Sequence, residues 1–198
     1  LKGPMPYSLH ESLVAPAREK SGALRLLSGL VTIALLYMTM VMLGSYAVVA
    51  VMGEAWLRAA TISPGLTTPG QILTILGSFS FMIVSVGVVV ILLHHRSPVT
   101  LVGGLRPAAT QFLQVIRGLV PYIVLIATFN FLTENLLPNL LLRQWLIFLP
   151  LTLLFLLIQV SAEELVFRGY LQSQLAALGL HKSIWILLPS ILFGLLHY

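Results

Sequence analysis

Long uninterrupted apolar runs constrain this chain more than any other feature of its sequence. Leu26 to Gly53 contain no charged side chain, and Ile72 to Leu93 form a second run of the same kind. A helix needs about 20 apolar residues to cross a bilayer, so both runs predict membrane-spanning helices. Gly118 to Thr133 and Gln144 to Ala162 predict two more. Ser183 to Tyr198 begin a fifth, which at about 1.5 Å per residue falls short of a full crossing.

The composition of the chain supports the same fold class. Of its 198 residues, 58% are hydrophobic and 9% are charged, and the mean hydropathy is +0.99. A soluble domain carries about 25% charged residues. We therefore predict an all-α fold, a polytopic bundle of about five transmembrane helices. Residues 1–25 are expected to form a cytoplasmic N-terminal tail with a short interfacial helix, and residues 26–198 a single helical membrane domain.

The charged residues indicate how the helices are oriented. Eleven Lys and Arg outweigh six Glu, and they concentrate before the first predicted span and between the second and third. Cytoplasmic loops carry such an excess of positive charge, which predicts a cytoplasmic N-terminus. The partner expected for this charge is the lipid bilayer. No nucleic-acid partner is expected, because no basic run is longer than two residues.

Two residue types are absent from the sequence, and their absence narrows the possible chemistry. The chain has no Cys and no Asp. Thiol nucleophiles, disulfides and Cys-ligated zinc are therefore excluded within this chain, as are an aspartyl dyad and a Ser-His-Asp triad. Any carboxylate chemistry has to use one of the six glutamates.

The stretch IQVSAEELVFRGYLQ, Ile158 to Gln172, places two glutamates and an arginine directly after an apolar run. An ionisable residue at the centre of a membrane helix costs about 2.5 to 3.5 kcal/mol on insertion scales, so these residues need partners. Glu164 and Arg168 are four residues apart, which predicts an ion pair along the helix. Glu163 points about 140° away from Arg168 and is left for acid–base work. The alternative is an ion network that only fixes helix packing.

The last apolar segment carries a histidine that could work with Glu163. In PSILFGLLHY, the side chains of Ser190, Phe193 and His197 fall on one helical face. Two antiparallel neighbouring helices would bring Glu163 and His197 together. A water held between a carboxylate and an imidazole can be activated for attack on an amide carbonyl. The alternative for His197 by itself is a satisfied core histidine.

Two motifs in these segments resemble a known family. EELVFR fits EExxxR and FGLLH fits FxxxH, and in this order they are similar to the first two motifs of the CAAX-protease and bacteriocin-processing family (CPBP, or Abi). The resemblance covers about Leu153 to Tyr198, and the family core is expected from about residue 115 onward. The earlier spans are similar only in being hydrophobic.

The resemblance implies a role for each matching residue. It implies that Glu163 and His197 are catalytic and that they hold and activate the attacking water. Glu164 and Arg168 correspond to supporting residues that shape the site, and Phe193 packs beside the histidine. No cofactor is expected. A bound metal stays an open alternative, although neither motif forms a full zinc set by itself.

The resemblance also implies a function, an intramembrane glutamate-type peptidase that hydrolyses a peptide bond of a membrane-tethered substrate. The family has a later motif, HxxxN or a close variant, and this chain ends before it, so the fold is expected to be C-terminally incomplete. The peptidase interpretation depends on that motif following beyond residue 198. The alternative is a non-catalytic family member that serves as a subunit or binding partner in a larger membrane complex. Family habit suggests the bacterial plasma membrane.

Two local features complete the predictions. His94, His95 and Arg96 follow the second span and predict an interfacial basic cluster that anchors it. In the turn ALGLHKS, Gly179 is expected at the position just past a helix end and Ser183 at the N-cap of the next helix.

Overall fold

The computed structural model describes residues 10–62, 68–133 and 140–197, and these residues form helices joined by short turns, with no strand among them. In chain order the elements are α1 (Glu11–Arg18), α2 (Ala23–Met52), α3 (Glu54–Ile62), α4 (Pro69–Leu92), the 3₁₀ helix η3 (Pro98–Val102), α5 (Leu105–Thr133), α6 (Leu142–Glu164), the π-helical segment η4 (Leu165–Gln172), α7 (Ser173–Ala177) and α8 (Lys182–Leu195). The predicted all-α class is confirmed.

Four helical stretches of the described residues are long and apolar enough to cross a membrane, as expected of an integral membrane protein. They are Ala23–Met52, Pro69–Leu92, Pro98–Thr133 and Leu142–Ala177. The third is longer than predicted, because α5 already begins at Leu105. The fourth continues through η4 and α7, and the fifth apolar helix, α8, is short, as its sequence predicts.

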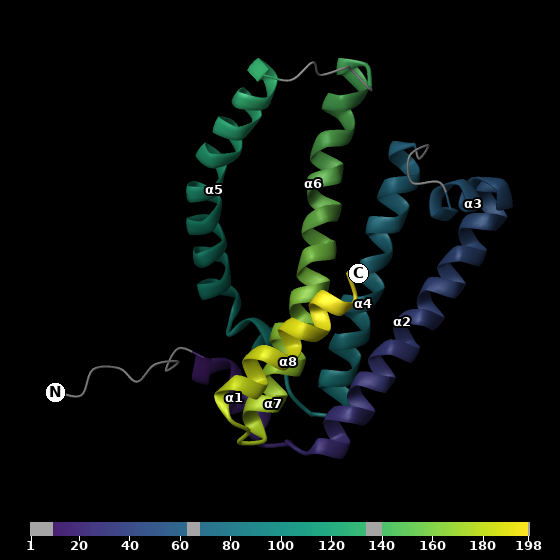
Figure 1. Ribbon diagram of the computed structural model, residues 1–198. Coiled ribbons are helices and arrows are strands. Elements are labelled where there is room, and N and C mark those ends of the chain that lie inside the picture. The colour runs from purple at the N-terminus through teal and green to yellow at the C-terminus, as the bar shows by residue number, and fades with distance from the viewer. Residues whose placement is uncertain (1–9, 63–67, 134–139, 198) are drawn as a thin grey trace.

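The helix α4 lies between α2 and α6 and packs against both (Figure 1). Glycines allow the close approach. A Cβ at Gly77 of α4 would lie 2.7 Å from Cε1 of Phe155 on α6, and one at Gly44 of α2 would lie 3.0 Å from Cε2 of Phe81. Small residues serve in this way because lipid provides no hydrophobic force between helices, and close packing has to hold them together.

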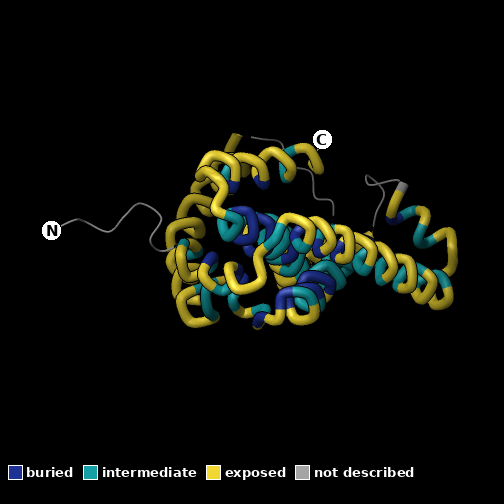
Figure 2. The backbone as a smooth tube through the Cα atoms, turned by 90° about the horizontal axis from the view of Figure 1, so that it is seen from below, coloured by how far each residue is buried: buried dark blue, intermediate teal, exposed yellow. Residues whose placement is uncertain are grey.

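The buried core lies at the end of the bundle where α1 and α7 are found. Its largest fully buried members include Tyr170 of η4, together with Val86, Val89 and Val90 of α4. Viewed from this end, buried segments lie between the helices and exposed residues form the outer surface (Figure 2). No residue of α5 is buried. The core therefore ties α4 to η4 rather than to α5.

The segment predicted as a tail contains a packed helix. Val14 and Ala17 of α1 are buried, and α1 lies against α7. His10, just before α1, stacks on Trp185 of α8 with ring centroids 4.7 Å apart. The expected short helix is thus present, while the domain boundary at residue 25 stays a prediction.

The turn between α7 and α8 reverses the chain. Gly179 has a φ of +73° just past the end of α7, which is the conformation predicted for it. The predicted N-cap is wrong. His181 caps α8, because its Nδ1 accepts a hydrogen bond from the backbone N–H of Ser183 at 3.3 Å. This places Ser183 inside the first turn, and α8 returns alongside η4 (Figure 1).

Candidate active site

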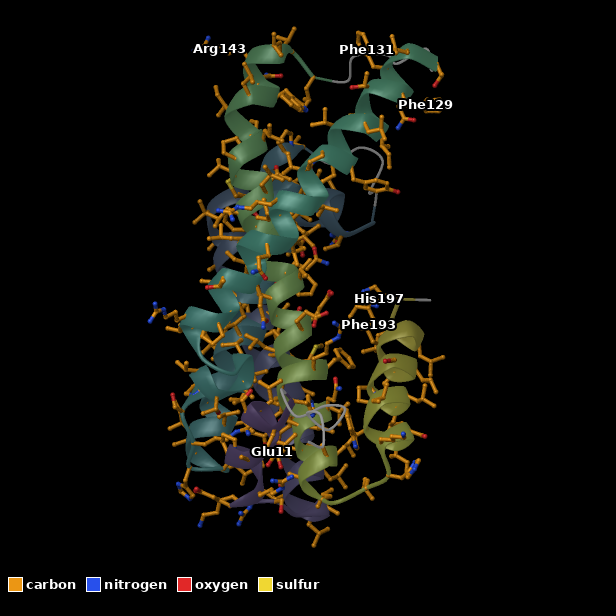
Figure 3. The ribbon with its side chains drawn as sticks, turned by 90° about the vertical axis from the view of Figure 1, so that its left-hand side faces the viewer. Glu11, Phe129, Phe131, Arg143, Phe193 and His197 are labelled. Atoms are coloured by element: carbon orange, nitrogen blue, oxygen red, sulfur yellow. The ribbon has the colours of Figure 1, made fainter. Side chains whose placement is uncertain are left out.

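Glu163 of α6 and His197, just past the end of α8, lie close together across the turn between α7 and α8. The two residues are equally far along the chain from Leu180 in the turn, so an antiparallel return brings them to the same level. Glu163 Oε1 and His197 Nε2 are 3.9 Å apart. Figure 3 shows Phe193 and His197 on the side of α8 that faces the neighbouring long helix. The predicted proximity of these two side chains is confirmed.

The carboxylate of Glu163 is mostly enclosed. Its side chain is 15% exposed, whereas the His197 side chain is 51% exposed. Gln159, one turn earlier on α6, donates from Nε2 to Glu163 Oε1 at 3.4 Å. A carboxylate with such an amide donor beside it keeps acceptor capacity for a further hydrogen. The same oxygen therefore faces both Gln159 and the imidazole.

The hydrogen bond of the other imidazole nitrogen settles the tautomer of His197. Nδ1 lies 2.8 Å from the backbone oxygen of Phe193. A carbonyl oxygen only accepts, so Nδ1 carries the hydrogen and donates it. In the neutral ring, Nε2 is then an unprotonated acceptor, and it is this nitrogen that faces Glu163. The Phe193 ring lies 4.4 Å from the imidazole and makes an edge contact with Phe167 at 5.3 Å.

The second glutamate of the motif has a different partner. Arg168 forms an ion pair with it, with Nε 3.2 Å from Glu164 Oε2, as the spacing of four residues predicts. The side chains are 73% and 45% exposed, so the net stabilisation from the pair is at most about 1 kcal/mol in a solvated setting. Its effect is to separate the two neighbouring carboxylates. Glu164 is directed to Arg168, and Glu163 is directed to α8.

Two hollows border this ion pair. A pocket of about 110 Å³ between η4 and α8 is lined by the pair together with Phe167, Gln172, Ser190 and Phe193. A larger groove of about 400 Å³ lies on the side of η3 and α5. Its lining is mainly apolar and includes Leu101, Phe112, Leu157 and Leu165. The smaller pocket is thus lined in part by charged and polar side chains, and the larger groove mainly by apolar ones.

Within residues 10–62, 68–133 and 140–197, no three His or Glu side chains are grouped so that they could hold a metal ion.

The interpretation of His94 and Arg96 as an interfacial anchor is wrong. His94 is 2% exposed and Arg96 is 9% exposed. His94 Nε2 lies 2.8 Å from Oη of Tyr170, and Arg96 Nη2 donates to Ser173 Oγ at 3.4 Å. Only His95 of this trio is exposed. Burial lowers the pKa of His94, which keeps its ring neutral at pH 7.

Sequence reasoning missed this buried polar cluster because its members are far apart in the chain. His94 and Tyr170 are separated by 76 positions. The letters HHR after an apolar run are typical of a membrane edge, and they carry no signal of a partner in another helix. The only hint in the sequence is the set of polar residues soon after Arg168, which indicates that this helix buries hydrogen-bonding groups. These residues are Tyr170, Gln172, Ser173 and Gln174.

The comparisons with known proteins bear on the same region. Residues 143–198 match the family model described as type II CAAX prenyl endopeptidase Rce1-like. The match begins within α6 and includes η4, α7 and α8, and it confirms the resemblance indicated by the two motifs. No curated protein and no solved structure matches the chain.

Proposed function

Starting from the match of residues 143–198 to the CAAX prenyl endopeptidase family model, we propose that this protein is an intramembrane peptidase. It hydrolyses a peptide bond in a membrane-associated substrate. The observation that carries the proposal is the 3.9 Å separation between Glu163 Oε1 and His197 Nε2. This distance is too long for a direct hydrogen bond and short enough for one water to contact both atoms.

The tautomer of His197 supports a role in activating water. Ionised Glu163 and the neutral His197 Nε2 are both acceptors. One water can donate a hydrogen to each of them, which leaves its oxygen lone pairs free to attack a carbonyl carbon. Glu163 takes the proton as the carbon–oxygen bond forms, and the proton then goes to the leaving amine when the carbon–nitrogen bond breaks. His197 orients the water through its second hydrogen.

The Glu164–Arg168 pair supports this division of work between the glutamates. Two adjacent free carboxylates would repel each other. The arginine compensates the charge of Glu164, which leaves Glu163 without a cationic partner on its own helix and available to act as the base. This arrangement is consistent with the supporting role that we propose, from the resemblance, for Glu164 and Arg168.

The substrate is proposed to approach from the bilayer. The apolar groove whose lining includes Glu164 and Arg168 would accept a lipid-modified or strongly apolar segment. A prenylated C-terminus is the substrate class that the family description names. We place the N-terminus in the cytoplasm, on the side that carries most Lys and Arg. The proposed location is the plasma membrane of a bacterium, which rests on the family resemblance.

A cleavage assay tests the proposal directly. The full chain would be reconstituted in liposomes with a dye-labelled farnesylated peptide that ends in a CAAX tetrapeptide, and the products would be identified by mass spectrometry. We expect Glu163→Gln and His197→Gln each to lower the cleavage rate about 100-fold or more, the usual contribution of acid–base groups.

A matched carboxylate control is available on another helix. Glu54→Gln removes a glutamate that is paired with Arg58 at 3.2 Å on the exposed surface of α3, and it should leave the rate unchanged. Equal processing by the wild type and both site variants would reject the peptidase assignment. The non-catalytic membrane subunit would then be the better description.

A further inference from the structure

The end of α4 places a histidine inside the protein where its sequence predicts a membrane edge. His94 lies two residues past the end of α4 at Leu92 and is 2% exposed. Its Nε2 lies 2.8 Å from Oη of Tyr170, and the two rings meet edge-on with centroids 5.3 Å apart. Tyr170 itself is fully buried in the π-helical segment η4. One buried side-chain hydrogen bond thus joins α4 to η4.

The other ring nitrogen of His94 has two neighbours. Nδ1 lies 3.3 Å from the backbone oxygen of Lys20 and 3.1 Å from Nε2 of Gln174. His94 therefore connects the segment before α2 with both η4 and α7. Burial keeps the pKa of His94 below its ordinary value. The hydrogen bond to the Lys20 backbone oxygen opposes this effect, and the nearby charges of Arg96 and Arg25 add to it. A neutral ring suits this position because the ring is buried and lies near the cations Arg96 and Arg25.

Further contacts hold η4 and the start of α7 against their neighbours. Arg96 donates to Ser173 Oγ at 3.4 Å. A Cβ at Gly169 would meet the backbone oxygen of Leu101 at 3.0 Å, so η4 packs directly on the backbone of η3. Tyr170 also lies against Gly29 of α2. The segment that follows the EExxxR motif is held by side chains and backbone from three other elements.

The π-helical geometry explains why such an anchor matters. A π-helix is rare, occurs mostly as short insertions in α-helices, and is frequent at functional sites. If η4 relaxed to an α-helix, the register of the helix would shift. A shift by one residue would turn the preceding part of α6 by about 100° relative to α8. Glu163, just before η4, would then no longer face His197. The register of η4 thus decides whether the two proposed catalytic residues meet.

We propose that His94 is a positioning residue for the Glu163–His197 pair. It acts through its hydrogen bond to Tyr170, which holds η4 in the π-helical register that directs Glu163 toward α8. The role in catalysis rests on the proposed peptidase function, whereas the effect on η4 does not. His94 touches neither the substrate nor the reacting atoms.

The length of a replacement side chain provides a sharp test. The amide nitrogen of Gln can take the place of His Nε2, whereas that of Asn matches Nδ1 and ends short of Tyr170. His94→Gln should therefore preserve the bond and His94→Asn should lose it. Tyr170→Phe removes only the hydroxyl. The exposed neighbour serves as a control through His95→Asn, since Asn tolerates the positive φ of 51° at that position.

Two measurements on the full chain in liposomes separate the outcomes. With the farnesylated CAAX peptide as probe, we expect Tyr170→Phe and His94→Asn to lower kcat about tenfold while KM stays within about twofold. His94→Gln and His95→Asn should keep kcat near that of the wild type. Hydrogen exchange of the amides of residues 165–172 should become faster in the first two variants only.

Each result decides the proposal. Unchanged exchange in Tyr170→Phe and His94→Asn would overturn it, as would an equal loss of kcat in His94→Gln and His94→Asn. If the wild type fails to cleave the probe, the proposed function fails for this substrate. The exchange pattern of the four variants would then still support or overturn the control of η4 by His94.

Discussion

Replacing Gly29 by alanine should destabilise the protein, because Gly29 is the point where α2 touches the buried tyrosine of η4. A Cβ built on Gly29 would lie 1.9 Å from Oη of Tyr170, 3.0 Å from its Cζ and 3.3 Å from Cγ1 of Val89. Tyr170 has no exposed surface, and its hydroxyl is bonded to His94 at 2.8 Å. The ring has little space to move away, and any shift stretches that bond.

Opposing effects set the magnitude of the change. Overpacking of this kind costs about 1–3 kcal/mol, and the loss of the Tyr170–His94 hydrogen bond adds about 1 kcal/mol. The better helix propensity of alanine over glycine offsets about 1 kcal/mol. We therefore expect Gly29→Ala to lower the free energy of unfolding by about 2 kcal/mol.

Unfolding in mixed micelles of detergent and SDS, followed by circular dichroism, measures this difference. Gly118→Ala on α5 is the matched control, because a Cβ there meets nothing within 4 Å, and it should be neutral or slightly stabilising. Gly29→Ala combined with Tyr170→Phe should recover part of the loss, since the phenylalanine lacks the oxygen nearest to the new methyl group. A Gly29→Ala protein as stable as the wild type would refute the reasoning about this contact.

Two further predictions concern the end of the bundle near α1. Burial lowers the pKa of His94 and of His10, so the unfolded chain takes up protons first as the pH falls below 6.5. The free energy of unfolding should therefore decrease below that pH, by at most about 1.4 kcal/mol per pH unit and group. The decrease should be smaller in His94→Gln than in the wild type. An equal decrease in the wild type and His94→Gln would contradict this prediction. The ring of His10 stacks on that of Trp185, so cysteines at these two positions should lie close together. In this cysteine-free chain, a short bifunctional thiol reagent should therefore link His10→Cys to Trp185→Cys. The link would be detected as a mobility shift after the chain is cleaved between α1 and α8. A pair of His10→Cys with Trp145→Cys, at the far end of α6, should not be linked, and equal linking of both pairs would argue against the docking of α1.

Much of the fold could be predicted because hydrophobic length is a local property. The spans beginning near Leu26 and Ile72 were located within a few residues of their observed limits. The start of the third was missed, because Arg106 and Arg117 interrupt the apolar pattern although the helix continues through both. Charge ends an apolar run without ending a helix.

Part of the candidate site could also be predicted, for a geometric reason. The Glu164–Arg168 pair depends only on a spacing of four along one helix, and it forms. Glu163 and His197 depend on one turn in addition, and the glycine in that turn makes the reversal recognisable. The sequence predicts Ser183 as the N-cap because serine is among the preferred N-cap residues, whereas His181 caps the helix through its ring nitrogen.

The amino-acid sequence by itself determined that this chain is a helical membrane protein, and that an acid–arginine motif and a histidine lie on consecutive apolar helices. These properties follow from composition and from contacts between near neighbours in the chain. Only the tertiary structure decided that His94 and Arg96 are buried rather than interfacial, and that η4 is a π-helix packed on Gly29. Such contacts join residues 76 or more positions apart. They depend on how whole helices pack, and no local pattern of residues encodes that packing.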